Sequence, residues 1–229
     1  QVIIGGVCSS ESLAMVPIAK KSKVLLLSAV SSSPDLTGAS QYFTRIFPSD
    51  ASQGVILAEQ VNAHGYKNIA ALIEEGDYPL GIYTVFEKKL TDLRVHTTKE
   101  LVTSDATDFR TVLSKLQTAN PDILFIDVQA APMADLILKE LQDMNWDIPL
   151  MFSETVASDA PTMKKYASLT EDSLAATIAF DENQAILDQL IATYQQTYHT
   201  DLPYHSYSLL EYDSVYLIKD AITAVGYDG

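Results

Sequence analysis

The strongest constraint on the fold is a serial alternation of short apolar runs with amphipathic helical patterns. The runs at residues 24–27, 68–73 and 123–128 are too apolar for strands with one wet face. Within residues 109–116, apolar side chains recur at i, i+3, i+4 and i+7, which is typical of one face of a helix. This β-α-β-α order predicts an α/β fold with mostly parallel sheets and helices on both faces.

The expected elements follow the same pattern along the chain. We expect strands at residues 2–5, 24–27, 68–73, 93–101, 123–128, 148–152 and 174–179, and helices at 10–20, 51–63, 80–90, 109–116, 136–144, 159–166, 186–198 and 206–225. Ser10 is a candidate N-cap of the first helix. Residues 1–6 are expected to form a buried strand and a turn. Because a domain rarely begins inside its core, we expect this chain to be part of a longer one.

Composition excludes several classes of partner. The chain has 229 residues, enough for one core or two, with 15 Lys+Arg against 30 Asp+Glu and a net charge of −15. Such an acidic chain is a poor match for nucleic acid or for an anionic membrane surface. No apolar run approaches the roughly 20 residues of a membrane-spanning helix, so we expect no span in this segment.

No enzyme motif is present in the sequence. It lacks the G-x-S-x-G, Walker, G-x-G-x-x-G and H-E-x-x-H patterns, and its four histidines are scattered. We therefore expect no catalytic residue, no metal and no cofactor. Cys8, the single cysteine, could be a nucleophile at a helix N-terminus, but no histidine has a reason to lie beside it.

Small hydroxyl side chains gather after the first two predicted strands. Parallel strands end at one edge of a sheet, where ligands bind. Ser9 and Ser10 lie where a turn becomes a helix, so backbone N–H groups and hydroxyls could bind a carboxylate or phosphate there. Residues 31–33, all serine, should face the same edge. Alternatively, Ser10 is a plain N-cap and the serine run a plain turn.

Acidic and aromatic side chains follow the later strands. Tyr78 could close over a ligand or cap the sheet edge. Asp127 ends an apolar strand, and could belong to a site or tie down the next turn. Glu154 could hold a ligand ammonium, or could be an exposed loop charge. The cluster of Glu74, Glu75 and Asp77 has no metal-like spacing and is interpreted as solvated charge.

The order of these segments resembles a known receptor family. The chain is similar to the branched-chain amino-acid-binding type of ABC-transporter solute receptor, a type I periplasmic binding protein with a Venus-flytrap fold. The resemblance rests on residues 5–10, 28–37, 45–54, 108–109, 121–123 and 209–221. It implies two lobes, each a parallel sheet flanked by helices. Residues 1–46 and 181–229 would be parts of an incomplete first lobe, and residues 47–180 a nearly complete second lobe.

The resemblance also implies roles for single residues. The expected ligand-binding set is Ser9, Ser10, Val30, Ser32, Tyr78, Gln129 and Glu154. Ser9 matches the serine that bonds the ligand carboxylate, and Glu154 the acid that pairs with its ammonium. Val30 and Ser32 match the loop whose carbonyl and hydroxyl hold the ammonium and carboxylate, and Tyr78 a tyrosine that closes on the ligand. Gln129 stands where some members place an aromatic residue, which suggests a more polar ligand.

The function implied by the resemblance is that of an extracytoplasmic receptor for an ABC importer. It would bind an amino acid or a similar small polar ligand between the lobes and deliver it to a membrane permease. The protein would be periplasmic or extracellular and lipoprotein-anchored, and Cys8 could pair with a cysteine outside this segment. The alternatives are a ligand-sensing regulator or receptor ectodomain of the same fold, and an enzyme acting through Cys8 or Asp127.

Overall fold

A computed structural model describes residues 1–179, 181 and 184–226. The chain divides into two compact units. Unit 1 comprises residues 1–48 and 179–229, and unit 2 comprises residues 49–178. Residue 180, where the expected second lobe ends, lies outside the described residues. All strand pairs in both units are parallel, which confirms the predicted α/β fold with parallel sheets.

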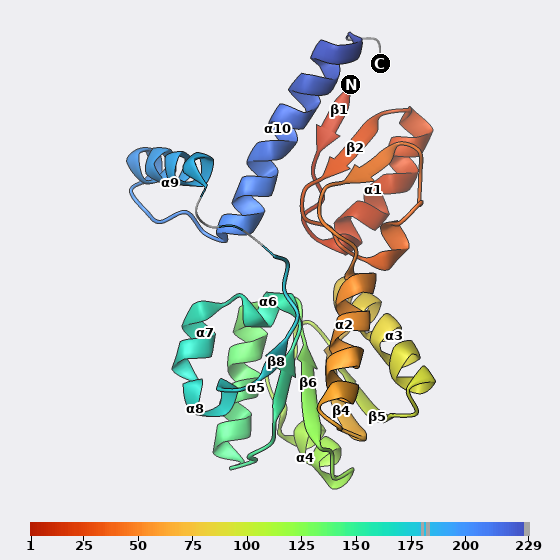
Figure 1. The fold of residues 1–229 in the computed structure, drawn as a ribbon, viewed down its shortest axis with the longest axis vertical. Coiled ribbons are helices and arrows are strands. Elements are labelled where there is room, and N and C mark those ends of the chain that lie inside the picture. Colours follow the sequence, from red (N-terminus) through yellow and green to blue (C-terminus); the bar gives the residue numbers. More distant parts are fainter. Residues whose placement is uncertain (180, 182–183, 227–229) are drawn as a thin grey trace. The chain divides into compact units, whose positions relative to one another are not determined.

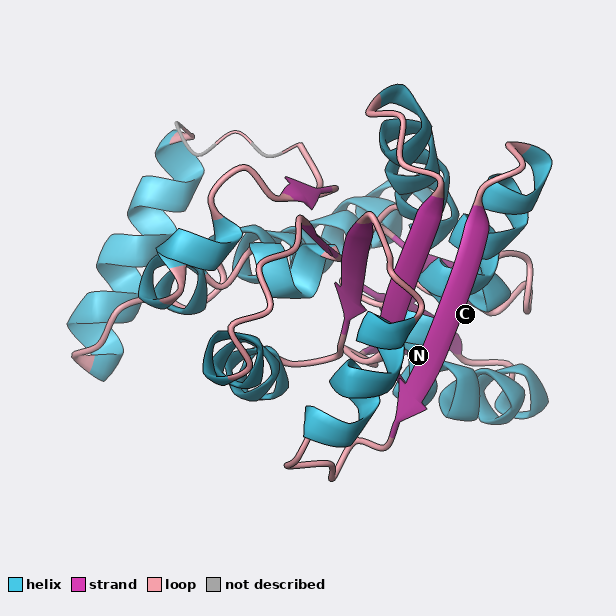
Figure 2. Cartoon of the chain, turned by 90° about the horizontal axis from the view of Figure 1, so that it is seen from below, coloured by secondary structure: helices cyan, strands magenta, loops and turns pink. Residues whose placement is uncertain are grey.

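The sheet of unit 2 has five strands in the order β5-β4-β6-β7-β8. These are β4 (Asn68–Glu74), β5 (His96–Val102), β6 (Ile123–Asp127), β7 (Leu150–Phe152) and β8 (Leu174–Ala175). In the register, Ile73 pairs with Asp127, and Ile126 with Phe152. The carboxyl ends of the three inner strands therefore lie at one level, and Figure 2 shows the strands side by side among the helices.

Helices cover both faces of this sheet, because its strands are apolar on both sides. The first core joins alternate residues of β4, β6 and β7 to α2 (Asp50–Ala63) and α3 (Asp77–Asp92). The second joins the intervening residues to α4 (Arg110–Thr118) and α5 (Ala131–Asp143). Figure 1 shows α2 and α3 on one side of the strands and α5 on the other. Three short helices follow β7: α6 (Glu154–Ala157), α7 (Ala160–Lys165) and α8 (Ala167–Thr170).

Gly54 lets α2 and α3 approach closely. A Cβ at this position would lie 2.8 Å from the Ile82 carbonyl oxygen and 3.0 Å from the Phe86 backbone nitrogen. Both contacts are with backbone, which cannot rotate away. The helices are therefore held at a separation that only a glycine permits.

Unit 1 has a smaller sheet and long helices. Its three strands, in the order β1-β2-β3, are β1 (Val2–Ile4), β2 (Leu25–Ser28) and β3 (Phe43–Arg45). Its helices are α1 (Ser9–Ser22), the 3₁₀ turn η1 (Pro34–Leu36), α9 (Ala185–Tyr198) and α10 (His205–Val225). The last two follow one another without a strand among the described residues, as predicted. Its core comprises Val16, Ala19, Leu26 and Leu36.

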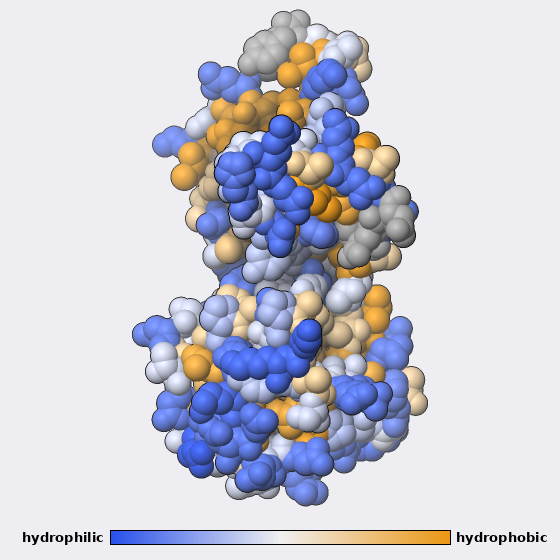
Figure 3. Space-filling view, turned by 90° about the vertical axis from the view of Figure 1, so that its left-hand side faces the viewer, coloured by the Kyte–Doolittle hydropathy of each residue, from blue (hydrophilic) through white to orange (hydrophobic). Residues whose placement is uncertain are grey.

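The structure corrects several expectations about unit 1. The strand β1, predicted to be buried, is exposed: Val2, Ile3 and Ile4 keep 36–42% of their surface. The reason is that β1 is an edge strand, which among the described residues pairs with β2 alone. Figure 3 shows hydrophobic side chains at the surface of unit 1. Val215 and Leu217 of α10 are also exposed. The short strand β3 was not predicted at all.

The start of α1 also differs from the prediction. The N-cap is Cys8, whose backbone is extended, and Ser10 lies in the first turn. Glu11 accounts for this shift, because its carboxylate Oε2 accepts the N–H groups of Val7 and Cys8 at 3.0 and 3.1 Å. An acidic side chain in the first turn thus satisfies donors before the helix, as in a capping box.

We expect Gly54→Val to destabilise unit 2 by about 1–3 kcal/mol, the usual cost of overpacking a close contact. The valine side chain would meet backbone atoms of α3, so the two helices would have to separate. Urea denaturation followed by circular dichroism measures the change. Ala63→Val, at the exposed end of the same helix, is the control. Equal losses in the two variants would show that the close approach is not important.

Candidate functional site

Two strand-end loops of unit 1 meet because β1 and β2 are parallel neighbours, with Ile4 opposite Leu27. The loop after β1 leads into α1, and the loop after β2 contains the serine run at residues 31–33. The prediction that the two hydroxyl-rich loops share one edge is therefore confirmed. What holds them together is a set of serine hydroxyls bonded to backbone.

The Gly6 carbonyl is the centre of this set. It accepts hydrogen bonds from the hydroxyls of Ser28 at 2.6 Å, Ser31 at 2.7 Å and Ser12 at 3.3 Å. Ser31 Oγ also lies 3.2 Å from the carbonyl oxygens of the next two residues. Gly6 has a φ of +78°, and a Cβ there would lie 2.1 Å from Ser12 Oγ. A glycine is therefore required for this convergence.

Ser9 joins the same two loops through its side chain. Its Oγ accepts the backbone N–H groups of Ser33 at 3.1 Å and Ser32 at 3.4 Å, and only 2% of its surface is exposed. Because Oγ is the acceptor in both bonds, the hydroxyl proton remains available for a third partner. The N–H groups of Ser9 and Ser10 open α1 and have no intrahelical carbonyl to bond. Donors therefore gather at the start of α1.

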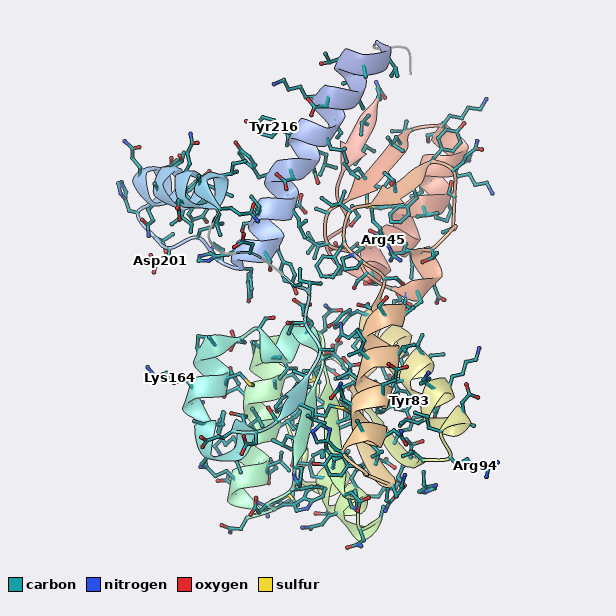
Figure 4. All side chains as sticks on the ribbon, in the orientation of Figure 1. Arg45, Tyr83, Arg94, Lys164, Asp201 and Tyr216 are labelled. Atoms are coloured by element: carbon teal, nitrogen blue, oxygen red, sulfur yellow. The ribbon has the colours of Figure 1, made fainter. Side chains whose placement is uncertain are left out.

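The other side of the second loop is held by Arg45. Its guanidinium donates to the Ser33 carbonyl at 2.7 Å and to Thr37 Oγ1 at 2.8 Å (Figure 4). Val30, the predicted carbonyl contact, lies in the same loop, and its N–H is 3.4 Å from Ser28 Oγ. Four of the predicted residues are therefore close together in unit 1: Ser9 and Ser10 in the first turn of α1, and Val30 and Ser32 on the adjoining loop after β2.

Cys8 is a free, half-buried thiol at the same turn. Burial raises its pKa above the ordinary value, and the neighbouring Glu11 carboxylate raises the pKa further. Both effects favour the neutral thiol at pH 7. A thiolate nucleophile needs the opposite environment, so the surroundings argue against catalysis by Cys8.

At the strand-end edge of unit 2, buried acids replace the hydroxyls. Glu74, at the end of β4, is buried, and its Oε2 accepts the backbone N–H of Gln129 at 2.6 Å. Its interpretation as solvated charge was therefore wrong, although Glu75 and Asp77 are exposed as predicted. The bond fixes the loop after β6, which carries Gln129, a predicted site residue. The error arose because the acid belongs to the strand rather than to the loop after it.

Glu154 opens the short helix α6 directly after β7. Only 4% of its surface is exposed, which is not the exposed loop charge considered as an alternative. The backbone N–H of Glu154 donates to Gln53 Oε1 of α2 at 3.0 Å. The Glu154 carboxylate oxygen Oε1 accepts the Ser158 hydroxyl at 3.4 Å. Gln53 was missed by the sequence analysis, because it lies in a helix and 101 positions away.

Tyr78 reaches the same short helix from α3. Its ring is buried, and its hydroxyl oxygen accepts Thr155 Oγ1 at 2.8 Å and the Thr155 N–H at 3.4 Å. Burial raises the pKa of the Tyr78 phenol well above its usual value, and the charges of Asp127, Asp50 and Glu154 raise it further. The phenol is therefore neutral at physiological pH.

Asp127 is the most unusual of these acids. Its side chain is fully buried, and neither carboxyl oxygen has a hydrogen-bond partner among the residues that the structure describes. Burial is the main cause that raises its pKa well above the ordinary value. The hydroxyl of Ser153 acts in the opposite direction, and the charges of Asp50 and Glu74 raise the pKa further. The named charges are both negative, so Asp127 is held in its protonated form.

The two edges thus offer opposite chemistry. Unit 1 presents hydroxyl and N–H donors, whereas unit 2 presents buried carboxyl groups near Glu154, Gln129 and Tyr78. Among the described residues, no group of three or more His, Cys, Asp or Glu side chains could hold a metal ion. In the same part of the chain, no helix is both long and apolar enough to cross a membrane.

Comparison with known proteins gives one matching family model. It is described as the receptor family ligand binding region, and it matches residues 1–228. A curated relative is the leucine-, isoleucine-, valine-, threonine- and alanine-binding protein of Pseudomonas aeruginosa, 26% identical over 234 residues. The alignment covers 98% of this chain and 60% of that relative, so this chain spans less than two thirds of its length.

Solved structures agree with this family match. The leucine-binding protein LivK of Thermotoga maritima has a TM-score of 0.82 and 26% identity, with 98% of this chain and 64% of that chain covered. A solute-binding protein of an R. palustris ABC transporter, in complex with 4-hydroxybenzoate, has a TM-score of 0.82 at 18% identity. The match covers 99% of this chain and 63% of the R. palustris chain. The predicted resemblance is confirmed, and these relatives are named for binding rather than for a reaction.

We expect Asp127→Asn to flatten the pH dependence of stability. In the unfolded chain an aspartate loses its proton near pH 4, whereas the raised pKa keeps Asp127 protonated in the folded state. The folded state therefore binds more protons above pH 4, and the free energy of unfolding falls as pH rises, by at most about 1.4 kcal/mol per pH unit.

Urea denaturation at pH 5 and pH 8 measures this effect. The variant should gain stability relative to the wild type at pH 8, and the gain should shrink at pH 5. Asp77→Asn, an exposed acid of the same strand-end region, should leave the difference between the two pH values unchanged. Parallel pH profiles for wild type and Asp127→Asn would contradict the assignment of a buried proton.

Proposed function

Because the chain belongs to the family described as the receptor family ligand binding region, we propose that it is the ligand-binding part of an ABC-importer receptor. The ligand is an amino acid or a similar small polar molecule that carries both a carboxylate and an ammonium group. The curated relative is named for five amino acids and the LivK structure for leucine, which supports this class of ligand.

The observation that carries the proposal is the chemical contrast between the two strand-end edges. The edge of unit 1 has the Ser9 hydroxyl proton, which bonds no acceptor among the described residues, and the first-turn N–H groups of α1, and both suit a carboxylate. The edge of unit 2 has buried carboxyl groups and suits a cation. A zwitterion carries the complement of both edges.

The residues we assign to the ligand follow from this contrast. Ser9, Ser10 and the Ser32 hydroxyl are assigned to the carboxylate, and the Val30 carbonyl and Glu154 to the ammonium. Gln129 is assigned to the ligand side chain, and its amide favours a ligand range that includes more polar amino acids besides leucine. The expectation that Tyr78 closes on the ligand stays a prediction.

The setting of the protein follows from the family and remains a proposal. We propose a periplasmic or extracellular location with a lipoprotein anchor, and a membrane permease that receives the ligand. The net charge of −15 gives this segment no electrostatic attraction to anionic lipid.

Isothermal titration calorimetry of the full-length protein against the 20 common L-amino acids and 4-hydroxybenzoate tests the proposal. We expect binding of at least one amino acid, and no binding of 4-hydroxybenzoate, which has no ammonium group. Ser9→Ala and Glu154→Gln should each weaken binding about tenfold or more, the scale of one hydrogen bond to a charged group.

Two variants serve as matched controls in the same experiment. Ser33→Ala removes a hydroxyl that accepts the Asp35 N–H, and Glu75→Gln removes an exposed charge beside the strand end. Both should bind within about twofold of wild type, well below the tenfold step that marks 1.4 kcal/mol. Failure of every amino acid to bind, or wild-type binding by Ser9→Ala and Glu154→Gln, would refute the proposed function.

A further inference from the structure

The helix α6 carries Glu154 but cannot hold its own position. It has only four residues, fewer than a helix needs to be stable alone. Its N-cap, Ser153, makes no side-chain capping hydrogen bond. The position of Glu154 must therefore be set by groups outside the helix, while its carboxylate accepts the Ser158 hydroxyl at 3.4 Å.

The first external group is the Tyr78 hydroxyl. The ring of Tyr78 is packed in the core between α3 and the sheet, so the hydroxyl is carried on a rigid support. It accepts both the side-chain and the backbone donor of Thr155, at 2.8 and 3.4 Å. These two bonds fix the residue that directly follows Glu154.

The second external group is the Gln53 side chain. Its Oε1 accepts the N–H of Glu154 itself at 3.0 Å, one of the donors that the start of a helix leaves without an intrahelical partner. Gln53 is next to Gly54, where α2 lies close to the backbone of α3. The supports from α2 and α3 therefore belong to one rigid pair of helices.

We propose that Tyr78 and Gln53 are positioning residues that aim the Glu154 carboxylate at the ligand ammonium. This inference rests on the proposed function, in which Glu154 binds that group. Tyr78 acts on Glu154 through Thr155, in addition to the predicted closure of its ring on the ligand. Gln53 acts directly on the backbone of Glu154. The pair thus determines how strongly the protein distinguishes an amino acid from the same acid without its amino group.

A double-mutant cycle between Tyr78 and Thr155 tests the first part. The probes are L-leucine and 4-methylpentanoate, which is leucine without its α-amino group, and the method is calorimetry on the full-length protein. We expect Tyr78→Phe and Thr155→Val each to weaken leucine binding about tenfold, as for one lost hydrogen bond near a charge, and the double variant no further. Binding of 4-methylpentanoate should stay unchanged.

Matched variants separate positioning from a general loss of structure. Tyr83→Phe removes a buried hydroxyl of the same helix that bonds Glu87 at 2.8 Å, and should leave leucine binding unchanged (Figure 4). Thr155→Ser keeps the hydroxyl and, unlike Thr155→Val, should bind leucine as the wild type does. Gln53→Ala should lower the leucine preference in the same way, whereas Gln60→Ala, exposed on the same helix, should not.

Two results would overturn the positioning role. One is an equal loss for both probes in Tyr78→Phe with wild-type binding in Thr155→Val, which would mean that Tyr78 affects binding only through its own contact with the ligand. The other is additive losses in the double variant. Failure of the proposed function gives a different result, because Glu154→Gln would then leave the ratio between the two probes unchanged.

Discussion

Parallel strand pairing is the constraint on which the rest of the structure depends. In both units every strand runs in the same direction as its neighbours, so the chain must return outside the sheet after each strand. The loops that follow the strands therefore collect at one edge. The residues that we assign to a ligand lie on such loops or on the first turns of the helices that follow them. Gln53, which positions one of them, comes instead from the side of a helix.

The two edges use buried polar groups in opposite ways. In unit 1 the Gly6 carbonyl is oversupplied with donors, so the loops are held in one conformation by neutral hydrogen bonds. In unit 2 several carboxyl groups lie together in low dielectric, and within the described part of the chain Asp127 has no hydrogen-bond partner. Burying such a group costs free energy unless it is protonated. The first edge thus holds its loops by neutral bonds and keeps donors to spare at the start of α1, whereas the second would gain from a nearby cation.

How much of this could be predicted depends on the range of the interactions. The order of strands and helices was predictable, because apolar periodicity is a local property, and so was the meeting of the two serine loops. The strand β3 was not, since its three residues include Thr44 and Arg45 and show no apolar run. The hydrogen bonds that Gln53 accepts from Glu154 and Tyr78 from Thr155 span 101 and 77 positions. They depend on how closely α2 and α3 pack, which no local pattern encodes.

The serine bonds of unit 1 have a consequence for how such a protein can evolve. The hydroxyls of Ser12, Ser28 and Ser31 bond backbone, whereas those of Ser10 and Ser32 make no hydrogen bond among the described residues. The three serines that hold the loops are therefore different residues from the two that we assign to the ligand. Of these two, Ser10 is exposed, so a substitution there is expected to leave the loop conformation unchanged. A lineage could acquire new specificities here by single steps, each of them a folded protein.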